Sequence, residues 1–390
     1  MGIIKSLIDT DLYKFTMMQA VFHQYHTAVV EYSFKCRNPG VNLWSYIGRL
    51  KSEVNDLCKL SFTADEIEYL KSKKYFKKDF INFLSEFRLS AEGVTITAIE
   101  NGEIDVKIKG TWVSKILFEV FILSLVNQIY FEEQNTEEVR AEGKRRLDKK
   151  ISFIKEKNVG SEFSITDFGT RRRFDRDWHE YVVKTLKDGL PNNFNGTSNV
   201  YLAKKFDLPV VGTMAHEWLQ AFQGLDGRLV DFQKAALESW AKEYRGELGI
   251  ALTDVVGIDA FLRDFDLYFC KLYDGVRHDS GNPHEWSEKM LAHYAGMNVD
   301  AKQKSFVFSD GLDVETSWAL FEQCKGRVKT FFGIGTNLTN DLGVKPLNVV
   351  LKMVECNGQP VAKVSDSNGK EMCKDADYIK HLKNVFKIKN

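Results

Sequence analysis

The chain has 390 residues, of which 44% are hydrophobic and 28% are charged, as in an ordinary soluble globular protein. Lys plus Arg and Asp plus Glu number 54 each, so no global basic field indicates nucleic-acid binding. The six cysteines contain no C-x-x-C pair, which argues against a zinc ribbon, and a disulfide framework is not expected in a chain this long. We therefore expect about two domains, reduced thiols and a cytoplasmic location.

The first third of the chain has a mixed pattern. A helix is predicted to begin near Asp11, and a strand is predicted over residues 31–37. Two alternating runs joined by Asn101-Gly102 predict a hairpin, because Asn-Gly favours the tight turn between paired strands. An apolar helix is predicted over residues 112–130, and a charged helix with a solvated face over residues 137–157.

The most apolar run, residues 116–131, is interrupted by Glu119, Asn127 and Gln128. It is too short and too polar to span a bilayer, so a buried helix is predicted here. The first residues also contain no extended apolar core, and no signal peptide is expected. We predict no association with a membrane.

From about residue 160, short apolar runs alternate with amphipathic helical segments. The apolar runs include 163–169, 208–213, 249–254, 305–311 and 330–335. Repeated alternation of this kind predicts parallel strands with helices outside. It fits an α/β barrel, irregular or incomplete, or an open doubly wound sheet, and the alternation alone does not separate the two.

The end of the chain leaves this rhythm. A second hairpin is predicted around Asn357-Gly358. Because this hairpin resembles the first third of the chain, we expect it to return to that region and make its domain discontinuous. The predicted domains are an α+β domain of residues 1–130 and 346–390, and an α/β barrel of residues 131–345.

Polar or glycine-rich clusters follow nearly every apolar run in the second half of the chain. They span residues 167–173, 196–199, 212–216, 253–257, 274–283, 309–313 and 333–337. Each cluster alone could be an ordinary turn. Because all of these clusters follow predicted strands, we expect them to lie at one end of the sheet. This position favours an active site, because loops at the carboxyl ends of parallel strands build the sites of such folds.

The composition of these clusters favours a phosphosugar or polyphosphate ligand. Arginine side chains suit phosphate or carboxylate, glycines let the backbone approach a ligand, and aspartates can hold a sugar hydroxyl or a magnesium ion. The residues are Arg171, Arg172, Arg173 and Arg277; Gly311, Gly333 and Gly335; and Asp254, Asp279 and Asp310.

His216 lies just past an apolar run, at the start of a predicted helix, on the side that carries these clusters. It could be a core histidine, a metal ligand, or a working base or nucleophile. Gln220 stands where a zinc metalloprotease motif needs a second histidine, and no cysteine cluster accompanies His216, so metal binding is the weakest option. No Walker A pattern occurs, which argues against a P-loop ATPase.

At these motifs the sequence resembles the nicotinate phosphoribosyltransferase family. The resemblance runs from LIDTDLYKFTM at residues 7–17 through DFGTRRR, GTSN, GTMAHEW, YDGVRHDSGNP, FSDGLD and FGIGTN, in family order. It implies the irregular α/β barrel of type II phosphoribosyltransferases, with a second domain built from both chain ends. It also implies an ATP-coupled, magnesium-dependent ligase that joins nicotinate to 5-phosphoribosyl-1-pyrophosphate (PRPP) in NAD salvage, through a phosphohistidine.

The resemblance assigns roles to individual residues. His216 matches the phosphorylated histidine, and Asp254 matches the residue that orients its ring. Tyr13 and Phe168 match the aromatic pair that sandwiches the pyridine. Because the family takes the tyrosine from a neighbouring subunit, a homodimer is expected.

The remaining assignments concern the ligand's charged groups. Arg171 is expected to reach PRPP or the ring carboxylate, with Arg277, Asp279, Ser280 and Gly281 at the pyridine and ribose. The phosphate-binding loops are expected to contain Asp310, Gly311, Gly333, Gly335 and Thr336. Magnesium is expected to bind mainly through substrate, and no protein ligand is assigned to it.

Ser198 is the predicted determinant of base choice. Amide-using relatives carry a carboxylate at this position, where it would repel nicotinate, and serine removes that repulsion. Nicotinate is therefore predicted over nicotinamide. The rival interpretations are a nicotinamide or quinolinate phosphoribosyltransferase and a non-catalytic phosphosugar-binding protein, and binding alone would need neither His216 nor Asp254.

Overall fold

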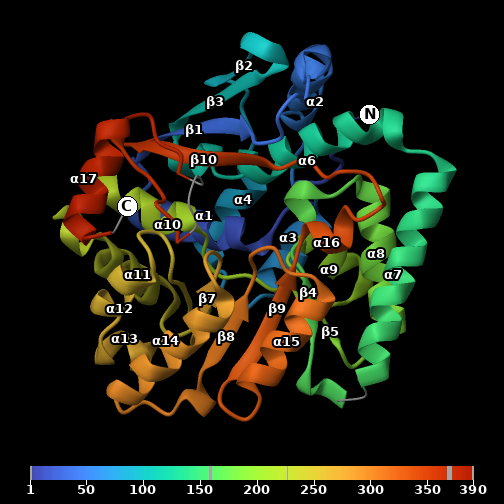
Figure 1. Cartoon of the computed structure of the whole chain (residues 1–390). Coiled ribbons are helices and arrows are strands. Elements are labelled where there is room, and N and C mark those ends of the chain that lie inside the picture. The colour runs from blue at the N-terminus through green and yellow to red at the C-terminus, as the bar shows by residue number, and fades with distance from the viewer. Residues whose placement is uncertain (1, 158–159, 226, 367–370, 389–390) are drawn as a thin grey trace. The chain divides into compact units, whose positions relative to one another are not determined.

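The computed structural model describes residues 2–157, 160–225, 227–366 and 371–388 (Figure 1). The chain forms two compact units, and each is described by itself. The first unit comprises Met1–His26, Tyr32–Gly212 and Ile334–Lys352, and the second comprises Thr27–Glu31, Thr213–Gly333 and Met353–Asn390. This division describes packing, and the predicted domains with boundaries at residues 130 and 346 stay a prediction.

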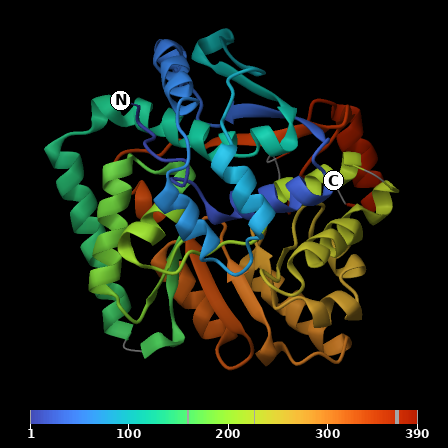
Figure 2. The same ribbon diagram turned by 180° about the vertical axis from the view of Figure 1, so that it is seen from behind.

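The first unit contains most of the helices and the hairpin predicted from Asn101-Gly102. Strands β2 (Val94–Ala98) and β3 (Ile104–Thr111) pair antiparallel, with Val94 opposite Ile108. Asn101 adopts the left-handed conformation, with φ of 58°, that the turn between them requires. The hairpin prediction is confirmed, and Figure 2 shows the hairpin in teal from behind.

The predicted apolar helix is also confirmed as a buried one. It comprises α5 (Trp112–Lys115) and α6 (Phe118–Phe131), and most side chains of α6 are buried. Among the described residues, the stretch Trp112–Gln134 is long and apolar enough to cross a membrane by length and composition alone, and 83% of its most apolar window is buried in the protein. Such burial is typical of a core helix, although absence of a membrane association stays a prediction.

Two of the other helices of this unit were predicted from the sequence. Helix α1 (Leu12–Gln24) begins after Asp11, and the charged segment forms α7 (Glu137–Lys157). The remaining elements are α2 (Ile47–Leu57), α3 (Ala64–Lys71), α4 (Lys78–Glu86), β4 (Ile165–Asp167), α8 (Arg176–Gly189), β5 (Phe194–Thr197), α9 (Val200–Phe206) and α16 (Thr336–Thr339). Strand β1 (Val29–Cys36) crosses the boundary between the units.

One predicted strand is wrong. The apolar run at residues 208–213 forms only an isolated bridge, in which Val210 pairs with Thr197 at the end of β5. Pro209 has no N–H to donate, so a ladder cannot continue through it. The backbones still approach closely, because a Cβ on Gly196 would lie 2.2 Å from the carbonyl oxygen of Pro209.

The second unit contains a parallel sheet. Strands β6 (Ile250–Leu252), β7 (Gly275–His278), β8 (Ser305–Phe308) and β9 (Lys329–Ile334) lie side by side in this order. Figure 1 shows β7, β8 and β9 next to one another. Only glycine fits at position 275, because a Cβ there would lie 2.1 Å from the carbonyl oxygen of Ser305.

Helices connect these strands, as the alternation predicted. Helices α12 (Ile258–Asp264) and α13 (Leu267–Leu272) lie between β6 and β7, α14 (Pro283–Gly296) between β7 and β8, and α15 (Val314–Cys324) between β8 and β9. Helices α10 (His216–Leu225) and α11 (Phe232–Tyr244) precede β6. Asn282 caps α14 by accepting from the backbone N–H of His284, and Pro283 occupies its first turn, where a missing N–H costs nothing. The mixed α/β fold class is confirmed.

The hairpin near the end of the chain is confirmed as well. Strand β10 (Val349–Cys356) turns through Asn357, which has φ of 49°, into β11 (Gln359–Pro360). The backbone N–H of Asn357 donates to the carbonyl oxygen of Val29 at 2.8 Å. The returning segment thus meets an early part of the chain, and it continues to helix α17 (Ala376–Phe386).

Candidate active site

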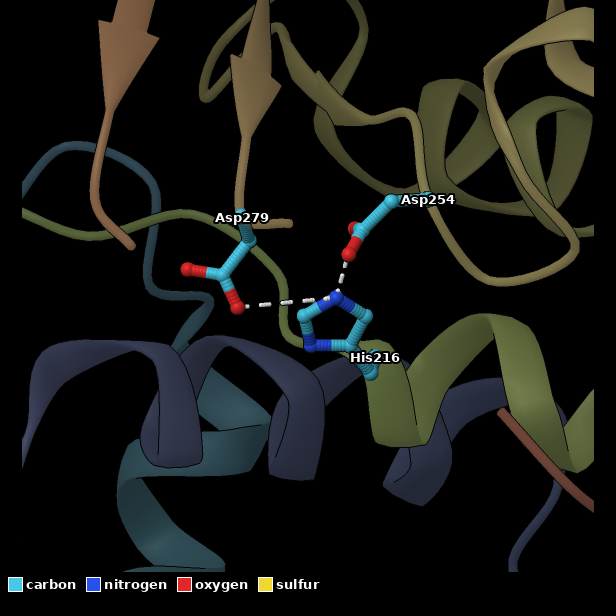
Figure 3. A group of neighbouring side chains, drawn as sticks. All are labelled: His216, Asp254 and Asp279. Atoms are coloured by element: carbon cyan, nitrogen blue, oxygen red, sulfur yellow. Dashed lines mark hydrogen bonds and ion pairs between the residues drawn. The ribbon is translucent and has the colours of Figure 1, made fainter. Parts of the chain in front are cut away.

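His216 is the first residue of α10, and its imidazole faces two carboxylates that follow neighbouring parallel strands. Asp254 lies two residues after β6, and Asp279 directly follows β7. Nε2 of His216 is 2.7 Å from Oδ1 of Asp254 and 3.7 Å from Oδ2 of Asp279 (Figure 3). The prediction that His216 lies with the loops at the carboxyl ends of the strands is therefore correct for this unit.

Lys363 also belongs to this group, and sequence reasoning missed it. Its Nζ is 2.8 Å from Nε2 of His216, 2.6 Å from Oδ2 of Asp254 and 3.9 Å from Oδ2 of Asp279. The side chain is only 7% exposed. The available signal was a lone lysine in the apolar run of residues 361–364, because a buried lysine needs a charged partner.

Hydrogen bonds hold both carboxylates in place. Oδ1 of Asp279 accepts from Nη2 of Arg277 at 3.1 Å and from the hydroxyl of Ser309 at 2.6 Å. The hydroxyl of Ser280 donates to Oδ2 of Asp254 at 2.6 Å. These bonds fix the direction of each carboxylate before any ligand binds.

The charges set the protonation states of the group. Burial alone would raise the pKa of the Asp254 carboxyl, but Lys363 and His216 hold it well below its usual range. Burial likewise opposes ionisation of Asp279, but Arg277 and the neighbouring cations lower its pKa. The pKa of His216 is lowered by burial and by Lys363, against the opposing attraction of Asp254. The ring is therefore neutral at neutral pH.

This arrangement can activate a histidine. When Nε2 carries the proton and donates a hydrogen bond to Asp254, Nδ1 keeps its lone pair and can act as a base or a nucleophile. In this tautomer the Lys363 ammonium donates to Asp254 and not to Nε2. The side chains of His216, Asp254 and Asp279 also offer ligand atoms within 4.8 Å of one another, a spacing that a divalent cation could use. The ammonium of Lys363 already contacts His216 and Asp254.

The other predicted residues of this unit lie at or near the same strand ends. Gly281 and Gly311 both have positive φ, 82° and 62°, so they supply loop conformations that other residues rarely adopt. Asp310 and Gly311 follow β8. Gly333 is an exception to the predicted pattern, because it lies inside β9 and not in a loop.

The remaining predicted residues belong to the first unit, namely Tyr13, Phe168, Arg171, Ser198, Gly335 and Thr336. Phe168 directly follows β4, and Ser198 directly follows β5. The backbone N–H of Leu12 donates to the carbonyl oxygen of Ser198 at 2.8 Å, which brings the start of α1 to the end of β5. A Cβ on Gly335 would lie 3.0 Å from the carbonyl oxygen of Phe168, so close packing already favours glycine there.

The three consecutive arginines have different environments. Arg173 is fully buried and donates from both terminal nitrogens to the carboxylate of Asp9, at 2.7 and 2.8 Å. Arg172 donates to the carbonyl oxygen of Val349 at 3.1 Å. Arg171 is 41% exposed, with Glu119 3.8 Å away. The prediction that all three supply ligand-binding forks is wrong for Arg173, because both of its terminal nitrogens pair with Asp9 in the core.

A buried network supports the loop that carries Phe168. The carboxylate of Asp167 contacts Nε2 of His179 at 2.6 Å, and it accepts from the Thr197 hydroxyl at 2.6 Å and the Gly169 N–H at 2.8 Å. Both Asp167 and His179 are fully buried. Burial opposes ionisation of Asp167, but His179 lowers the pKa of that carboxyl, so the pair holds the loop as a charged or strongly polarised contact.

Comparison with known proteins gives the family. Residues 163–390 match the nicotinate phosphoribosyltransferase (NAPRTase) family, and residues 8–127 match the N-terminal domain of that family. A nicotinate phosphoribosyltransferase of Burkholderia mallei is 53% identical over 388 residues, which cover 99% of this chain and 97% of the relative. One of Xanthomonas axonopodis pv. citri is 53% identical over 386 residues, covering 98% of each.

Solved structures agree with the sequence matches. The crystal structure of nicotinate phosphoribosyltransferase from Vibrio cholerae is 38% identical with a TM-score of 0.94, covering 100% of this chain and 95% of that one. The corresponding structure from Porphyromonas gingivalis is 34% identical with a TM-score of 0.93, covering 99% and 100%. The chain therefore belongs to the nicotinate phosphoribosyltransferase family.

Proposed function

We propose that this protein joins nicotinate to PRPP, giving nicotinate mononucleotide and pyrophosphate, and that it couples this reaction to hydrolysis of ATP. Full-length similarity to the family supports the phosphoribosyl transfer. The observation that carries the coupling is the short contact between Nε2 of His216 and Asp254, beside a lysine and a second carboxylate. Binding of a phosphosugar alone would require no oriented histidine.

In the proposed coupling, His216 accepts the γ-phosphoryl group of ATP. The lone pair of Nδ1 attacks phosphorus, an N–P bond forms, and the P–O bond to ADP breaks. Water later hydrolyses the N–P bond and releases phosphate. The lowered pKa of His216 supports this step, because it keeps the ring neutral and nucleophilic. Magnesium is expected to enter with the nucleotide and to offset the phosphate charges.

In the proposed transfer, the pyridine nitrogen of nicotinate attacks the anomeric carbon of PRPP, and the bond to pyrophosphate breaks. Tyr13 and Phe168 are proposed to hold the flat ring between them, with Tyr13 donated by the partner of a homodimer. Arg171 and Arg277 are proposed to bind the anionic groups, because guanidinium forks suit carboxylate and phosphate. The loops with Asp310 and Gly311 are proposed to lie at the 5′-phosphate.

The choice of nicotinate over nicotinamide is proposed to depend on Ser198, and the structure adds a second residue to that argument. The hydroxyl of Ser198 donates to Oδ1 of Asp11 at 2.7 Å. A carboxyl group therefore lies beside Ser198, although Ser198 itself carries no charge. Burial raises the pKa of Asp11, which favours its neutral form and reduces the repulsion that an anionic base would meet.

Two experiments test the proposal. Purified protein is incubated with γ-labelled ATP, and acid-labile, base-stable phosphate is measured on wild type and on His216→Ala, with His284→Ala as the control for an exposed histidine on α14. We expect label on wild type and on the control, and none on His216→Ala. An unlabelled wild type would contradict the coupling. Equal kcat/KM for nicotinate and nicotinamide would contradict the base preference.

A further inference from the structure

The C-terminal segment of residues 361–366 lies against the loops that carry Asp254 and Ser280. The backbone N–H of Val364 donates to the carbonyl oxygen of Val255 at 2.8 Å. The backbone N–H of Asp366 donates to the hydroxyl of Ser280 at 3.1 Å, and that hydroxyl donates to Asp254. Backbone and side-chain bonds thus tie the segment directly to the group around His216.

Helix α10 holds the other end of the same segment. The side chain of Gln223 donates to the carbonyl oxygen of Ala362 at 2.8 Å and accepts from its N–H at 2.9 Å. Gln223 lies two turns after His216 on this helix. The segment is therefore fixed on both sides of Lys363, which holds the backbone from which the lysine side chain reaches His216.

We propose that Lys363 is a positioning residue for phosphoryl transfer to His216: it is the resident cation of the site, occupying the place that a divalent metal ion would otherwise take between His216, Asp254 and Asp279. This inference rests on the proposed phosphorylation of His216. It gives the C-terminal segment a role in the reaction, because that segment supplies the ammonium.

The charges explain why the site needs this cation. Asp254 and Asp279 bring two negative charges, and Arg277 and Lys363 balance them. Without Lys363 the four positions carry a net negative charge, which repels the γ-phosphate of ATP and favours a protonated imidazole that has no lone pair to attack with. With Lys363 present, the ring can remain neutral beside two carboxylates. A phosphoryl group on His216 adds negative charge that the same ammonium can offset.

A purely structural role for Lys363 makes different predictions. If the lysine only anchors its segment, an uncharged side chain of similar length should preserve the reaction. Loosening the segment elsewhere should then be as harmful as removing the charge. The variants Lys363→Met, Lys363→Arg and Gln223→Ala separate these possibilities, because the first removes the charge, the second keeps it, and the third removes the two bonds to Ala362.

The first measurement is the initial rate of label uptake from γ-labelled ATP. We expect Lys363→Met to lose about 100-fold, the scale of removing one electrostatic donor from a reacting centre. Lys363→Arg should recover a large part of that loss, and Gln223→Ala should lose much less than Lys363→Met. Lys363→Met at the wild-type rate, or Gln223→Ala as slow as Lys363→Met, would overturn the proposal. If Lys363→Met does not fold, Lys363→Gln carries the same expectation.

The second measurement does not depend on phosphorylation. Binding of Mn²⁺ alone is followed by calorimetry and by electron paramagnetic resonance. We expect wild type to bind no Mn²⁺ at this site, and Lys363→Met to gain one site that Asp254→Asn removes. Mn²⁺ binding at this site in wild type, or no gained site in a folded Lys363→Met protein, would show that Lys363 does not hold a cation position. If wild type takes up no label but Lys363→Met gains the metal site, the proposed coupling fails while the resident-cation assignment stands.

Discussion

The ion pair between Asp9 and Arg173 is predicted to be a main source of stability in the first unit. Asp9 is 1% exposed and Arg173 is fully buried, and two parallel N–H···O bonds of 2.7 and 2.8 Å join them. Asp9 also accepts from the side chain of Asn199 at 2.8 Å. The substitution Asp9→Asn keeps the size of the side chain but leaves the Arg173 charge without its counter-ion.

The expected cost follows from this burial. Removing one partner of a buried ion pair destabilises a protein by about 3–5 kcal/mol, because the remaining charge cannot regain its hydration. With a urea dependence of about 3 kcal/mol per molar, the unfolding midpoint should fall by about 1 M or more. The measurement is urea unfolding at pH 7, followed by tryptophan fluorescence, to which the buried Trp112 and Trp178 of the first unit contribute.

A matched control uses the same substitution at the surface. Asp65 pairs with Lys204 and is 79% exposed, so Asp65→Asn should cost less than about 1 kcal/mol. If Asp9→Asn lowers the midpoint no more than Asp65→Asn, the reasoning about burial is wrong. Arg173 lowers the pKa of Asp9 against the effect of burial. The stability from this pair is therefore present above the unfolded carboxyl pKa, and we expect it to be lost as pH falls through the folded one.

Three further predictions concern the site. His179→Leu should lower the thermal midpoint by several degrees, since Asp167 would keep a buried charge without its partner; an unchanged midpoint would contradict this. Ser198→Asp should reduce kcat/KM for nicotinate by about tenfold or more and spare nicotinamide, because it adds a carboxylate where an anionic base is proposed to bind. Because the pKa of His216 is lowered from 6.5, label uptake should persist as pH falls to that value, whereas a rate already halved at pH 6.5 would count against a neutral ring there.

Sequence patterns predicted the elements whose local signals and burial agree. The charged helix α7 has the bounds that its pattern predicted, and the Asn-Gly pairs mark both hairpins. The strand predicted at residues 208–213 is wrong, because an apolar pattern indicates burial and does not show that the backbone pairs with a neighbour. Pro209 also removes a hydrogen-bond donor from the strand ladder. Gly333 was predicted in a loop but lies inside β9, close to its end. The ends of strands and helices are the positions that a sequence pattern predicts least well.

The site was predictable only as far as its residues follow strands. Asp254 and Asp279 follow strands β6 and β7, whereas His216 follows an apolar run that forms only an isolated bridge, and the structure brings the three side chains together. Lys363 could not be found in this way, because it comes from a distant segment and no motif near it marks a function. Arg173 is the opposite case, a residue that the sequence assigned to the site although it belongs to the core. Three adjacent arginines look alike in sequence, and only burial distinguishes the one that pairs with Asp9.

The position of Lys363 in the chain has a consequence for biosynthesis. Lys363 follows His216 by 147 residues, so a ribosome delivers the histidine and both aspartates well before their cation. Until then, the buried carboxylate of Asp254 lacks the lysine that balances it and should stay hydrated, which delays closure of the loop around it. If His216 is phosphorylated as proposed, the nascent chain is expected to remain unreactive toward ATP until residues 361–366 have emerged and docked.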